Sequence, residues 1–369
     1  MRVLHVLEAL EGGTARHVTD VVRHVGEVEH HVAVPDRRVG GGATDETAVP
    51  AMGAAGATIH RVEMRRLPVS PRNAAAVAQL GLLVRRLRPD VVHGHSSVGG
   101  ALARLAAGDS DAFRVYTPNG LHPSALAGGA ERLLSSRTDR LVAVSPSEAR
   151  IAAARGVADP HRIATIPNGV DLDPAPAEAP SLRRLAGLHG DGPLIGFVGR
   201  LVPQKAPLDF VAAAASVANR RGDAAFVLVG SGRLEASVRS TIGARSLDGV
   251  VGVAGHVPRA AAAIDQLDVL VLPSRYEGCP YVALEAMRAG VPVVTTDAVG
   301  CRDVVEHGVT GLTAPVGDTE GLASDILRVL ADPTSARRMV ETARRRLAER
   351  FDVRTMAGDI ALMYRLASR

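Results

Sequence analysis

The chain has 369 residues, too many for one comfortable core, which favours two domains of about 100 to 200 residues each. Aromatic residues make up 2% of the chain and tryptophan is absent, so platforms for stacking nucleic-acid bases are scarce and no nucleic-acid partner is expected. The net charge of +4 suits anionic ligands or an anionic membrane surface.

Short apolar runs rich in Val and Ile alternate with longer helical patterns, and Gly, Pro and Asp stand at the junctions. This rhythm predicts repeated β-α-β units and a parallel sheet. In the first half, strands are expected at residues 3–7, 31–34, 58–62, 91–93, 114–116, 141–144 and 163–166. Helices are expected between them, for example at residues 15–25 and 74–87.

The stretch 167–180 breaks this rhythm with four prolines, which remove backbone donors and fix φ, so we expect an interdomain linker at 167–190. Strands then resume at residues 194–198, 225–229, 250–254, 269–272 and 291–295, and after residue 318 the pattern is wholly helical. Two doubly wound halves facing each other would bind their ligand in one cleft, at the carboxyl ends of their strands.

Glycines at strand-to-helix turns mark candidate phosphate contacts. Gly12 and Gly13 follow the first strand, where a loop can present N–H groups at a helix N-terminus, although a simple tight turn is an equal alternative. Gly230 follows the strand 225–229 in the same way. Gly255 and His256 end the strand 250–254 and either hold the edge of a nucleobase or form a structural turn.

Two cations follow the strand 194–198. Gly199 and Arg200 close this strand, and Lys205 precedes the next helix. Arginine offers a planar fork and lysine a compact charge, a pair suited to neutralising a diphosphate. The alternative is two solvated charges at the mouth of a loop. Against it, Lys205 is the only lysine among 43 Lys and Arg residues, which favours a specific use of its ammonium group.

Two glutamates flank the helix start after the strand 269–272. Glu277 lies in the loop, Glu285 lies in the helix, and Pro280 suits the first helical turn. The N–H groups of residues 278–281 are free to receive phosphate or sugar oxygens. By itself, this spacing also fits an ordinary helix N-terminus with two acidic residues.

The ordered set of these features resembles the family 4 retaining glycosyltransferases, which have the GT-B fold of two Rossmann-like, doubly wound α/β domains facing an interdomain cleft. The set comprises Gly199-Arg200, Lys205, Gly230-Ser-Gly232, Gly255-His256, Glu277-x7-Glu285 and the segment Val299 to Gly308. The resemblance covers most of the chain, including Gly12 to Val18, Val91 to Ser97 and Pro167 to Asp171, and is most specific between Gly196 and Gly311.

This resemblance implies that Arg200, Lys205 and Glu277 carry the chemistry: the cations neutralise the donor diphosphate and Glu277 orients the donor sugar. The implied donor contacts are Gly12, Gly13, Gly199, Gly230, Gly255, His256, Gly278, Cys279, Pro280, Tyr281 and Glu285, with Glu285 on the ribose hydroxyls. No metal or other cofactor is implied. The implied domains are 1–175 with 351–369 for the acceptor and 190–350 for the donor.

One position departs from the family pattern. Many relatives carry a histidine near the reacting carbon in a Thr-x-His-like segment, and here Asn119 takes that place. Asparagine donates a hydrogen bond but does not titrate. His122 and His95 are the candidate replacements, although a lone histidine near a strand end is more often structural. With Arg16 these residues form the expected acceptor side.

The expected reaction moves a sugar from a UDP-sugar to an acceptor hydroxyl with retention, in a front-face mechanism that needs no dedicated base. Alternatives are a GT-B sugar-nucleotide 2-epimerase, a phosphorylase holding pyridoxal phosphate on Lys205, and a non-catalytic nucleotide-sugar sensor. The acceptor stays open between a lipid-linked sugar and a small soluble glycoside.

The two cysteines, Cys279 and Cys301, have no CxxC partner and no histidine at metal-ligand spacing, so neither a disulfide nor a zinc site is expected. A reducing cytoplasm fits this usage. No apolar run reaches the roughly 18 residues that span a bilayer. Any membrane contact is therefore expected to be peripheral, on the inner face, with the doublets Arg65-Arg66 and Arg85-Arg86 approaching it.

Overall fold

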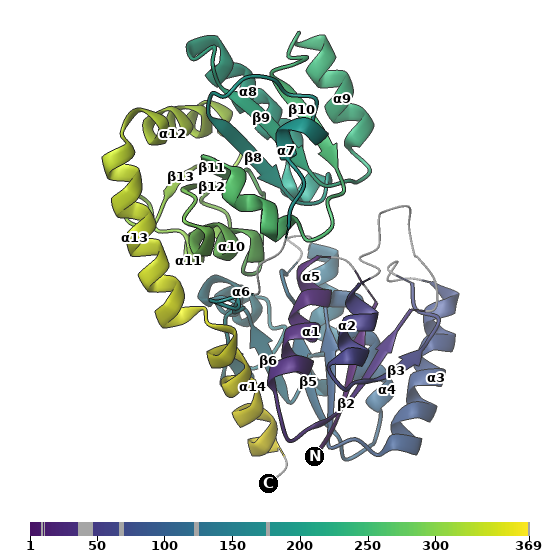
Figure 1. The fold of residues 1–369 in the computed structure, drawn as a ribbon. Helices are drawn as coiled ribbons and strands as arrows, with labels where there is room; N and C mark the ends of the chain where they lie inside the picture. The colour runs from purple at the N-terminus through teal and green to yellow at the C-terminus, as the bar shows by residue number, and fades with distance from the viewer. Residues whose placement is uncertain are drawn as a thin grey trace. The chain divides into compact units, whose positions relative to one another are not determined.

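The computed structural model describes residues 1–8, 10, 12–35, 47–65, 70–121, 125–174 and 178–367. The chain divides into two compact units (Figure 1), which we call the first unit (Met1–Asn168 with Val353–Arg369) and the second unit (Gly169–Asp352). Each unit contains one sheet whose paired strands all run parallel. The predicted class of two doubly wound α/β domains is therefore confirmed.

Among the described residues, the sheet of the first unit has seven strands in the order β3-β2-β1-β4-β5-β6-β7. They are β1 (Arg2–Leu7), β2 (Glu29–Val34), β3 (Thr58–Arg61), β4 (Val91–His95), β5 (Phe113–Thr117), β6 (Arg140–Ala143) and β7 (Ile163–Thr165). The central strands read as continuous apolar runs because helices cover both faces of the sheet. The chain order reverses between β1 and β4, which is where open parallel sheets bind ligands.

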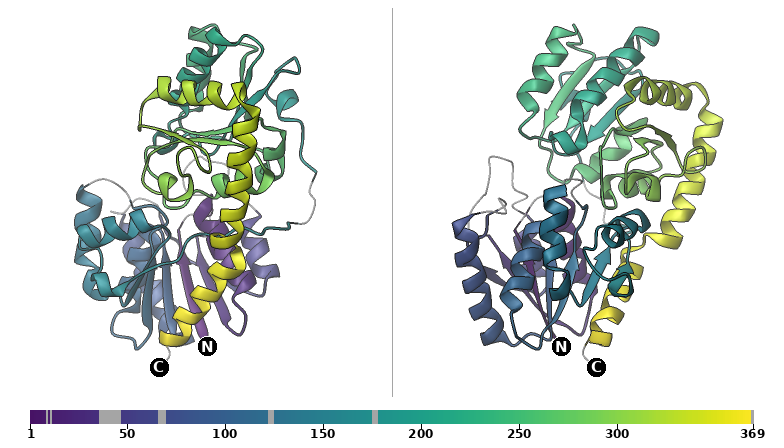
Figure 2. Two further views of the ribbon diagram at one scale, coloured as in Figure 1. Left: turned by 90° about the vertical axis from the view of Figure 1, so that its left-hand side faces the viewer. Right: turned by 180° about the vertical axis from the view of Figure 1, so that it is seen from behind.

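The helices of the first unit lie on both sides of this sheet. They are α1 (Gly13–His24), α2 (Ala48–Ala54), α3 (Pro71–Leu87), α4 (Ser97–Ala107), α5 (Ala125–Leu133), α6 (Pro146–Ala154) and α14 (Val353–Ala367). Buried residues of α3 and α4 pack with Leu4 and Val6, whereas those of α1 and α14 pack with Val3 and Val91 on the opposite face. Figure 2 shows α14, in yellow, running along the first unit.

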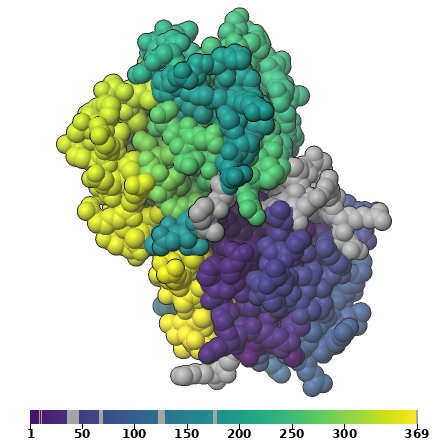
Figure 3. All heavy atoms as spheres, in the orientation of Figure 1, coloured from purple at the N-terminus to yellow at the C-terminus, as the bar shows by residue number. Residues whose placement is uncertain are grey.

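In the second unit, the described strands follow the order β10-β9-β8-β11-β12-β13, with a reversal between β8 and β11. They are β8 (Leu194–Val198), β9 (Ala225–Val229), β10 (Val251–Gly255), β11 (Val269–Leu272), β12 (Val293–Thr296) and β13 (Leu312–Ala314). The helices are α7 (Leu182–Leu185), α8 (Pro207–Arg220), α9 (Glu235–Ala244), α10 (Tyr281–Ala289), α11 (Cys301–Val304), α12 (Thr319–Ala331) and α13 (Pro333–Arg350). Figure 3 shows α12 and α13 along one side of this unit.

Two details of the second unit differ from the sequence prediction. The short edge strand β13 was not expected, because three residues carry no readable alternation. Pro280 was expected inside the first turn of its helix. It is instead the N-cap residue, with ψ of 109°, and α10 begins at Tyr281.

The boundary between the units also differs from the expected linker at 167–190. Within that stretch α7 packs on β9 and β10, and the Leu182 amide donates to Gln266 Oε1 at 2.9 Å. The Val170 amide donates to the carbonyl of Phe351 at 2.8 Å. These contacts place residues 169–174 and 178–190, together with 351–352, in the second unit, and the chain returns to the first unit only at Val353.

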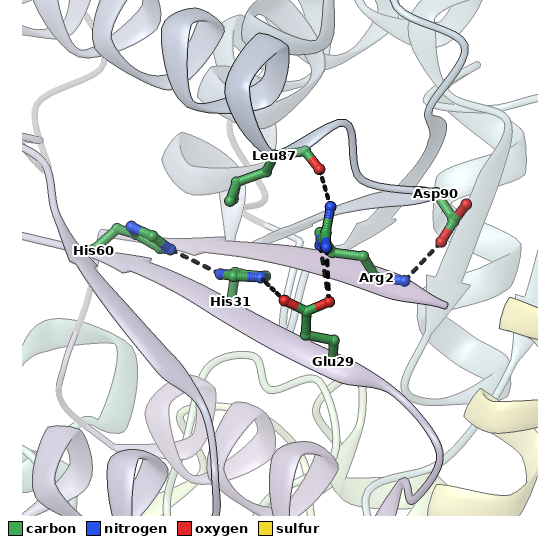
Figure 4. Close-up of polar contacts among 6 residues, drawn as sticks. All are labelled: Arg2, Glu29, His31, His60, Leu87 and Asp90. Carbon is green, nitrogen blue, oxygen red and sulfur yellow. Dashed lines mark hydrogen bonds and ion pairs between the residues drawn. The ribbon is translucent and has the colours of Figure 1, made fainter.

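A chain of polar contacts links the first three strands of the first unit (Figure 4). Arg2 Nε donates to Glu29 at 3.0 Å, Glu29 contacts His31 Nε2 at 2.9 Å, and His31 Nδ1 lies 2.9 Å from His60 Nε2. The Arg2 amide also donates to Asp90 at 2.6 Å. These residues belong to β1, β2, β3 and the turn before β4. Their side-chain contacts therefore link neighbouring strands in addition to the backbone pairing.

Arg104 on α4 forms a buried polar network in the same unit. Its guanidinium donates to Glu131 at 2.6 Å and lies 4.0 Å from the centre of the Tyr116 ring. The Tyr116 hydroxyl donates to the same carboxylate at 2.6 Å, and Arg104 Nη1 donates to Thr138 at 3.2 Å. Because the Arg104 side chain is fully buried, this network holds a charge pair inside the core.

No helix within the described part of the chain is both long enough and apolar enough to cross a membrane.

Candidate functional site

The predicted donor residues of the second unit gather on loops after β8, β9, β10 and β11. Gly199 and Arg200 follow β8, Gly230 follows β9, Gly255 ends β10 and His256 follows it, and Glu277 follows β11. Parallel strands end at the same edge of their sheet, so all of these loops lie at one edge. The loops after β8 and β11 flank the reversal of strand order, where ligand binding is expected.

Lys205 and Glu277 form an ion pair at this edge. Lys205 Nζ lies 2.6 Å from Glu277 Oε1, and the side chains are only 16% and 8% exposed. The Ser274 hydroxyl donates to the same oxygen at 2.7 Å. The sole lysine of the chain is therefore held at a defined position beside a carboxylate, and it is not a solvated charge at the mouth of a loop.

Gln204 links the loop that carries Lys205 to the loop that carries Glu277. Its side-chain amide donates to the carbonyl of Tyr276 at 3.1 Å, and its own carbonyl accepts from the Arg275 amide at 2.8 Å. The amide of Glu277 in turn donates to the carbonyl of Val299 at 2.9 Å. Three loops of the second unit are thus fixed to one another through backbone groups.

Gly230 allows the loops after β8 and β9 to approach closely. A Cβ atom at this position would lie 2.0 Å from the carbonyl oxygen of Gly199, and φ is +134°, a conformation that other residues rarely adopt. The Gly230 amide donates to the Gly255 carbonyl at 2.7 Å, and the Gly199 amide donates to Val229 at 2.9 Å. The three predicted glycines therefore meet at one point.

We expect Gly230→Ala to lower the free energy of unfolding by about 1 to 3 kcal/mol. The new Cβ atom would clash with the Gly199 carbonyl oxygen, and alanine would have to adopt a strained φ. Urea unfolding of the purified variant measures this loss. Gly222→Ala is the matched control, since a Cβ there meets no atom within 4 Å and φ is not positive. Equal midpoints for the two variants would contradict the interpretation.

The helix start at residues 278–281 lies beside Glu277. Cys279, Tyr281 and Glu285 are all buried, and α10 carries Tyr281 and Glu285. Gly300 packs against this turn from the loop after β12: a Cβ there would lie 2.3 Å from the Gly278 carbonyl oxygen. The loop after β12 therefore packs directly against the turn that precedes α10.

Cys301 also lies near the Glu277 carboxylate. Burial, followed by the negative charge of Glu277, raises the pKa of its thiol to about 12. The thiol is therefore protonated at neutral pH and is a poor nucleophile.

In the first unit, the expected residues surround the ends of β1, β4 and β5. Gly12 has φ of +67° and is the N-cap of α1, whose first residue is Gly13. Arg16 on the same helix contacts Asp20 at 3.5 Å.

Sequence reasoning missed Glu8, which follows β1 and accepts hydrogen bonds from the Ser96 hydroxyl at 2.5 Å and the Gly99 amide at 2.8 Å. Glu8 thus joins the loops after β1 and β4.

Asn119 stands in a left-handed turn after β5, with φ of +56°. Its Nδ2 donates weakly to the Thr117 carbonyl at 3.4 Å, and its Oδ1 is buried with no hydrogen-bond partner among the described residues. A buried acceptor of this kind is suited to a hydroxyl donor from a ligand.

Glu148, which sequence reasoning also missed, holds the Asn119 turn in place. Its carboxylate accepts from the amides of Gly120 at 2.6 Å, Leu121 at 3.0 Å and Val144 at 2.8 Å. The sequence contained a signal, since Ser145 and Glu148 have the spacing of a capping box. That pattern predicts a contact back to the N-cap and gives no hint that the glutamate reaches the neighbouring loop.

Of the two histidines that could replace the usual active-site histidine, the structure describes only His95. His95, at the end of β4, is fully buried, and its Nε2 lies 3.1 Å from His5 Nδ1. It therefore belongs to the core below the strand ends. His122 lies outside the described residues, as does Arg66 of the first arginine doublet.

Comparisons with known proteins match both halves of the chain to glycosyltransferases. Residues 11–174 match the family model for Glycosyltransferase Family 4, and residues 192–332 match the model for Glycosyl transferases group 1. The chain is 31% identical over 311 residues to 2-deoxystreptamine glucosyltransferase of Streptomyces kanamyceticus, covering 77% of this chain and 79% of that one. It is 28% identical to an Escherichia coli galactosyltransferase named for UDP-Gal and α-D-GlcNAc-diphosphoundecaprenol, covering 71% of each.

Among solved structures, Anabaena HepE in complex with UDP-glucose is similar over 100% of both chains, with a TM-score of 0.82 and 20% identity. At this identity the likeness concerns the fold, and together with the two parallel-sheet units it confirms the GT-B class.

Proposed function

The chain belongs to the family 4 glycosyltransferases, and from this premise we propose that it transfers a sugar from a UDP-sugar to an acceptor hydroxyl with retention at the anomeric carbon. The observation that carries the proposal is the buried pair of Lys205 and Glu277, held beside Gly199 and Gly230 at the strand ends of the second unit. This edge of the sheet brings together a cation suited to a diphosphate, a carboxylate suited to sugar hydroxyls, and glycine loops whose backbones lie close to each other.

The choice of uridine as donor nucleoside rests on the relatives. Anabaena HepE has been crystallised in complex with UDP-glucose, and the Escherichia coli relative is named for UDP-Gal as its donor. Glu285 on α10 is the group that we assign to the ribose hydroxyls, because it lies buried on the helix that follows the donor loop.

In the proposed reaction, Lys205 and Arg200 stabilise the negative charge that develops on the departing diphosphate. Lysine has three N–H donors, so Lys205 can contact a phosphate oxygen while it retains Glu277. Glu277 accepts hydrogen bonds from the donor sugar and orients it. The ion pair and the Ser274 hydroxyl position Lys205 and Glu277, which favours little reorganisation during the reaction.

The front-face step breaks the bond between the anomeric carbon and the phosphate oxygen and forms a bond to the acceptor oxygen on the same face. The acceptor proton passes to the departing phosphate oxygen, so the protein supplies no base. Asn119 is our candidate for a hydrogen-bonding contact with a ligand hydroxyl, since its Oδ1 is buried and its turn is fixed by Glu148.

The acceptor is proposed to be a hydroxyl of a cyclic polyol or sugar, free or lipid-linked. The relatives include an enzyme named for 2-deoxystreptamine and one named for α-D-GlcNAc-diphosphoundecaprenol. For a lipid-linked acceptor we propose peripheral attachment at the inner face of the membrane, in the cytoplasm.

The experiment is a thermal-shift screen with UDP-, GDP-, ADP- and dTDP-sugars, followed by incubation of the stabilising donor with candidate acceptors. A ligand present at 100 times its dissociation constant adds about 2.7 kcal/mol of stability. We expect a UDP-sugar to give the largest shift and nuclear magnetic resonance to show retention in the product. A new sugar nucleotide formed without acceptor would instead identify an epimerase, and binding without turnover a sensor.

A further inference from the structure

A cluster of histidines lies inside the first unit, below the ends of β1 and β4. Among the described residues it comprises His5 on β1, His17 on α1, His30 on β2, and His93 and His95 on β4, and none of these is more than 5% exposed. The cluster belongs neither to the donor loops nor to the network around Arg104. No step of the proposed transfer uses it.

The sheet register brings three of these rings together. His5 pairs with His93 across β1 and β4, and His95 lies two residues further along β4. In a parallel sheet, paired residues and residues two apart point to the same face. The ring centres of His93 and His95 are 4.0 Å apart, and those of His5 and His95 are 5.4 Å apart.

Hydrogen bonds order the rings but leave two nitrogen atoms without partners. His5 lies 3.1 Å from His95 Nε2 and 3.0 Å from His30 Nδ1, and His93 contacts the Tyr364 hydroxyl at 2.6 Å. Within the described chain, His95 Nδ1 and His17 Nε2 are buried and have no hydrogen-bond partner. Each such atom costs about 1 to 3 kcal/mol if nothing binds it, and His17 Nε2 is therefore available to a ligand. His95 Nδ1 would carry the ring proton when His95 binds a ligand through Nε2.

Burial keeps these rings neutral. It lowers the pKa values of His5, His93 and His95 well below that of an ordinary histidine, and the neighbouring rings lower them further. A neutral imidazole carries one nitrogen with a lone pair, which is the form that binds a metal ion.

We propose that His5, His93 and His95 form a binding site for one divalent cation of the zinc class. One nitrogen from each ring lies within 4.8 Å of the other two. A tetrahedral zinc ion with bonds of about 2.0 to 2.1 Å needs ligand nitrogens about 3.3 Å apart. His5 Nδ1 and His95 Nε2 are already 3.1 Å apart, and rotation of the His93 ring must bring its nitrogen to a similar distance from both.

A metal ion would replace some of the hydrogen bonds that the rings make now. His93 contacts Thr117 at 2.7 Å as well as Tyr364, and one of these two contacts must be released. His17 supplies the natural fourth position, because its Nε2 has no hydrogen-bond partner among the described residues and its ring centre lies 5.6 Å from that of His95. Imidazole nitrogen suits Zn²⁺ and Co²⁺ and disfavours Mg²⁺ or Ca²⁺. The bound ion would tie β1 to β4 immediately below the loops of Glu8 and Ser96.

The test uses the full-length protein and Co²⁺, whose visible absorption reports tetrahedral nitrogen ligands. Because the three rings are fully buried, the ion is supplied both to native protein and during refolding in chelator-treated buffer. We expect one equivalent of Co²⁺ per chain by elemental analysis, with a strong visible band that Zn²⁺ abolishes. His95→Gln should lower bound Co²⁺ at least tenfold.

Two control variants separate the site from other histidines. His30→Gln changes a buried ring that contacts His5 but lies outside the triad, and His161→Gln changes an exposed one. Both should keep one equivalent of Co²⁺. Should His95→Gln fail to fold, X-ray absorption of the zinc-loaded wild type must show three imidazole ligands, or four if His17 also binds. Absence of the band after refolding, or a shell of oxygen ligands, would overturn the proposal and leave the glycosyltransferase assignment untouched.

Discussion

Replacement of Lys205 by alanine is expected to lower kcat on the order of 100-fold or more, as for other groups that stabilise developing charge. The side chain is the only lysine amine in the chain, and it is held 2.6 Å from Glu277. Once the UDP-sugar and acceptor are identified, steady-state kinetics measures the loss. A fall in kcat with little change in KM for the donor is expected, because the contact strengthens as the diphosphate departs.

The control for Lys205→Ala must account for the carboxylate that loses its partner. Glu277→Gln retains the shape and the contact with Ser274 but removes the charge, and the double variant completes a cycle. Arg239→Ala, on an exposed pair with Glu235, should leave kcat within about twofold. Undiminished turnover in Lys205→Ala would refute the role that we assign to the ammonium group.

Arg104→Ala is expected to destabilise the first unit by about 3 to 5 kcal/mol, because it leaves the charge of Glu131 buried and unpaired. The substitution also removes the contact with the Tyr116 ring. Since whole domains are typically stable by about 5 to 15 kcal/mol, this is a large part of the total. Hydrogen exchange of amides in β4 and β5 reports the loss in this unit.

A second variant separates the charge effect from the lost packing. Arg104→Met with Glu131→Gln removes both charges while most of the volume stays, and it should regain a large part of the stability. The exposed pair of Arg220 and Glu320 gives the comparison, and Arg220→Ala should cost less than about 1 kcal/mol. Equal losses for Arg104→Ala and Arg220→Ala would contradict the importance of the buried pair.

The repeated β-α-β pattern was enough to predict both sheets, because strands such as β8 and β9 are uninterrupted apolar runs between glycine turns. The pattern did not predict β13, because a strand of three residues at the edge of the sheet is too short to show an alternation of apolar and polar residues. It also placed the linker too broadly, because the four residues of α7 are recognisable only by their packing on β10.

The candidate site was predictable only in part. Motif order pointed to Lys205 and Glu277 individually, but their ion pair depends on two loops meeting across the sheet. Glu148 looked like a helix cap, and its bonds to Gly120 and Leu121 depend on tertiary structure. The sequence singled out His95 only as an acceptor-side candidate. Its place beside His5 and His93 was not predictable, because the register that joins His5 to His93 spans 88 residues of chain.

The bonds of Gln204 to the donor loop have a consequence for protein engineering. In the proposed function Glu277 orients the donor sugar, so residues 275–277 would be changed to alter the sugar preference. Gln204, however, joins their backbone to the turn that carries Lys205. A redesigned loop would therefore displace the ammonium group as well. Selectivity and turnover should change together in directed evolution from this scaffold, and second substitutions that recover activity are expected near residue 204.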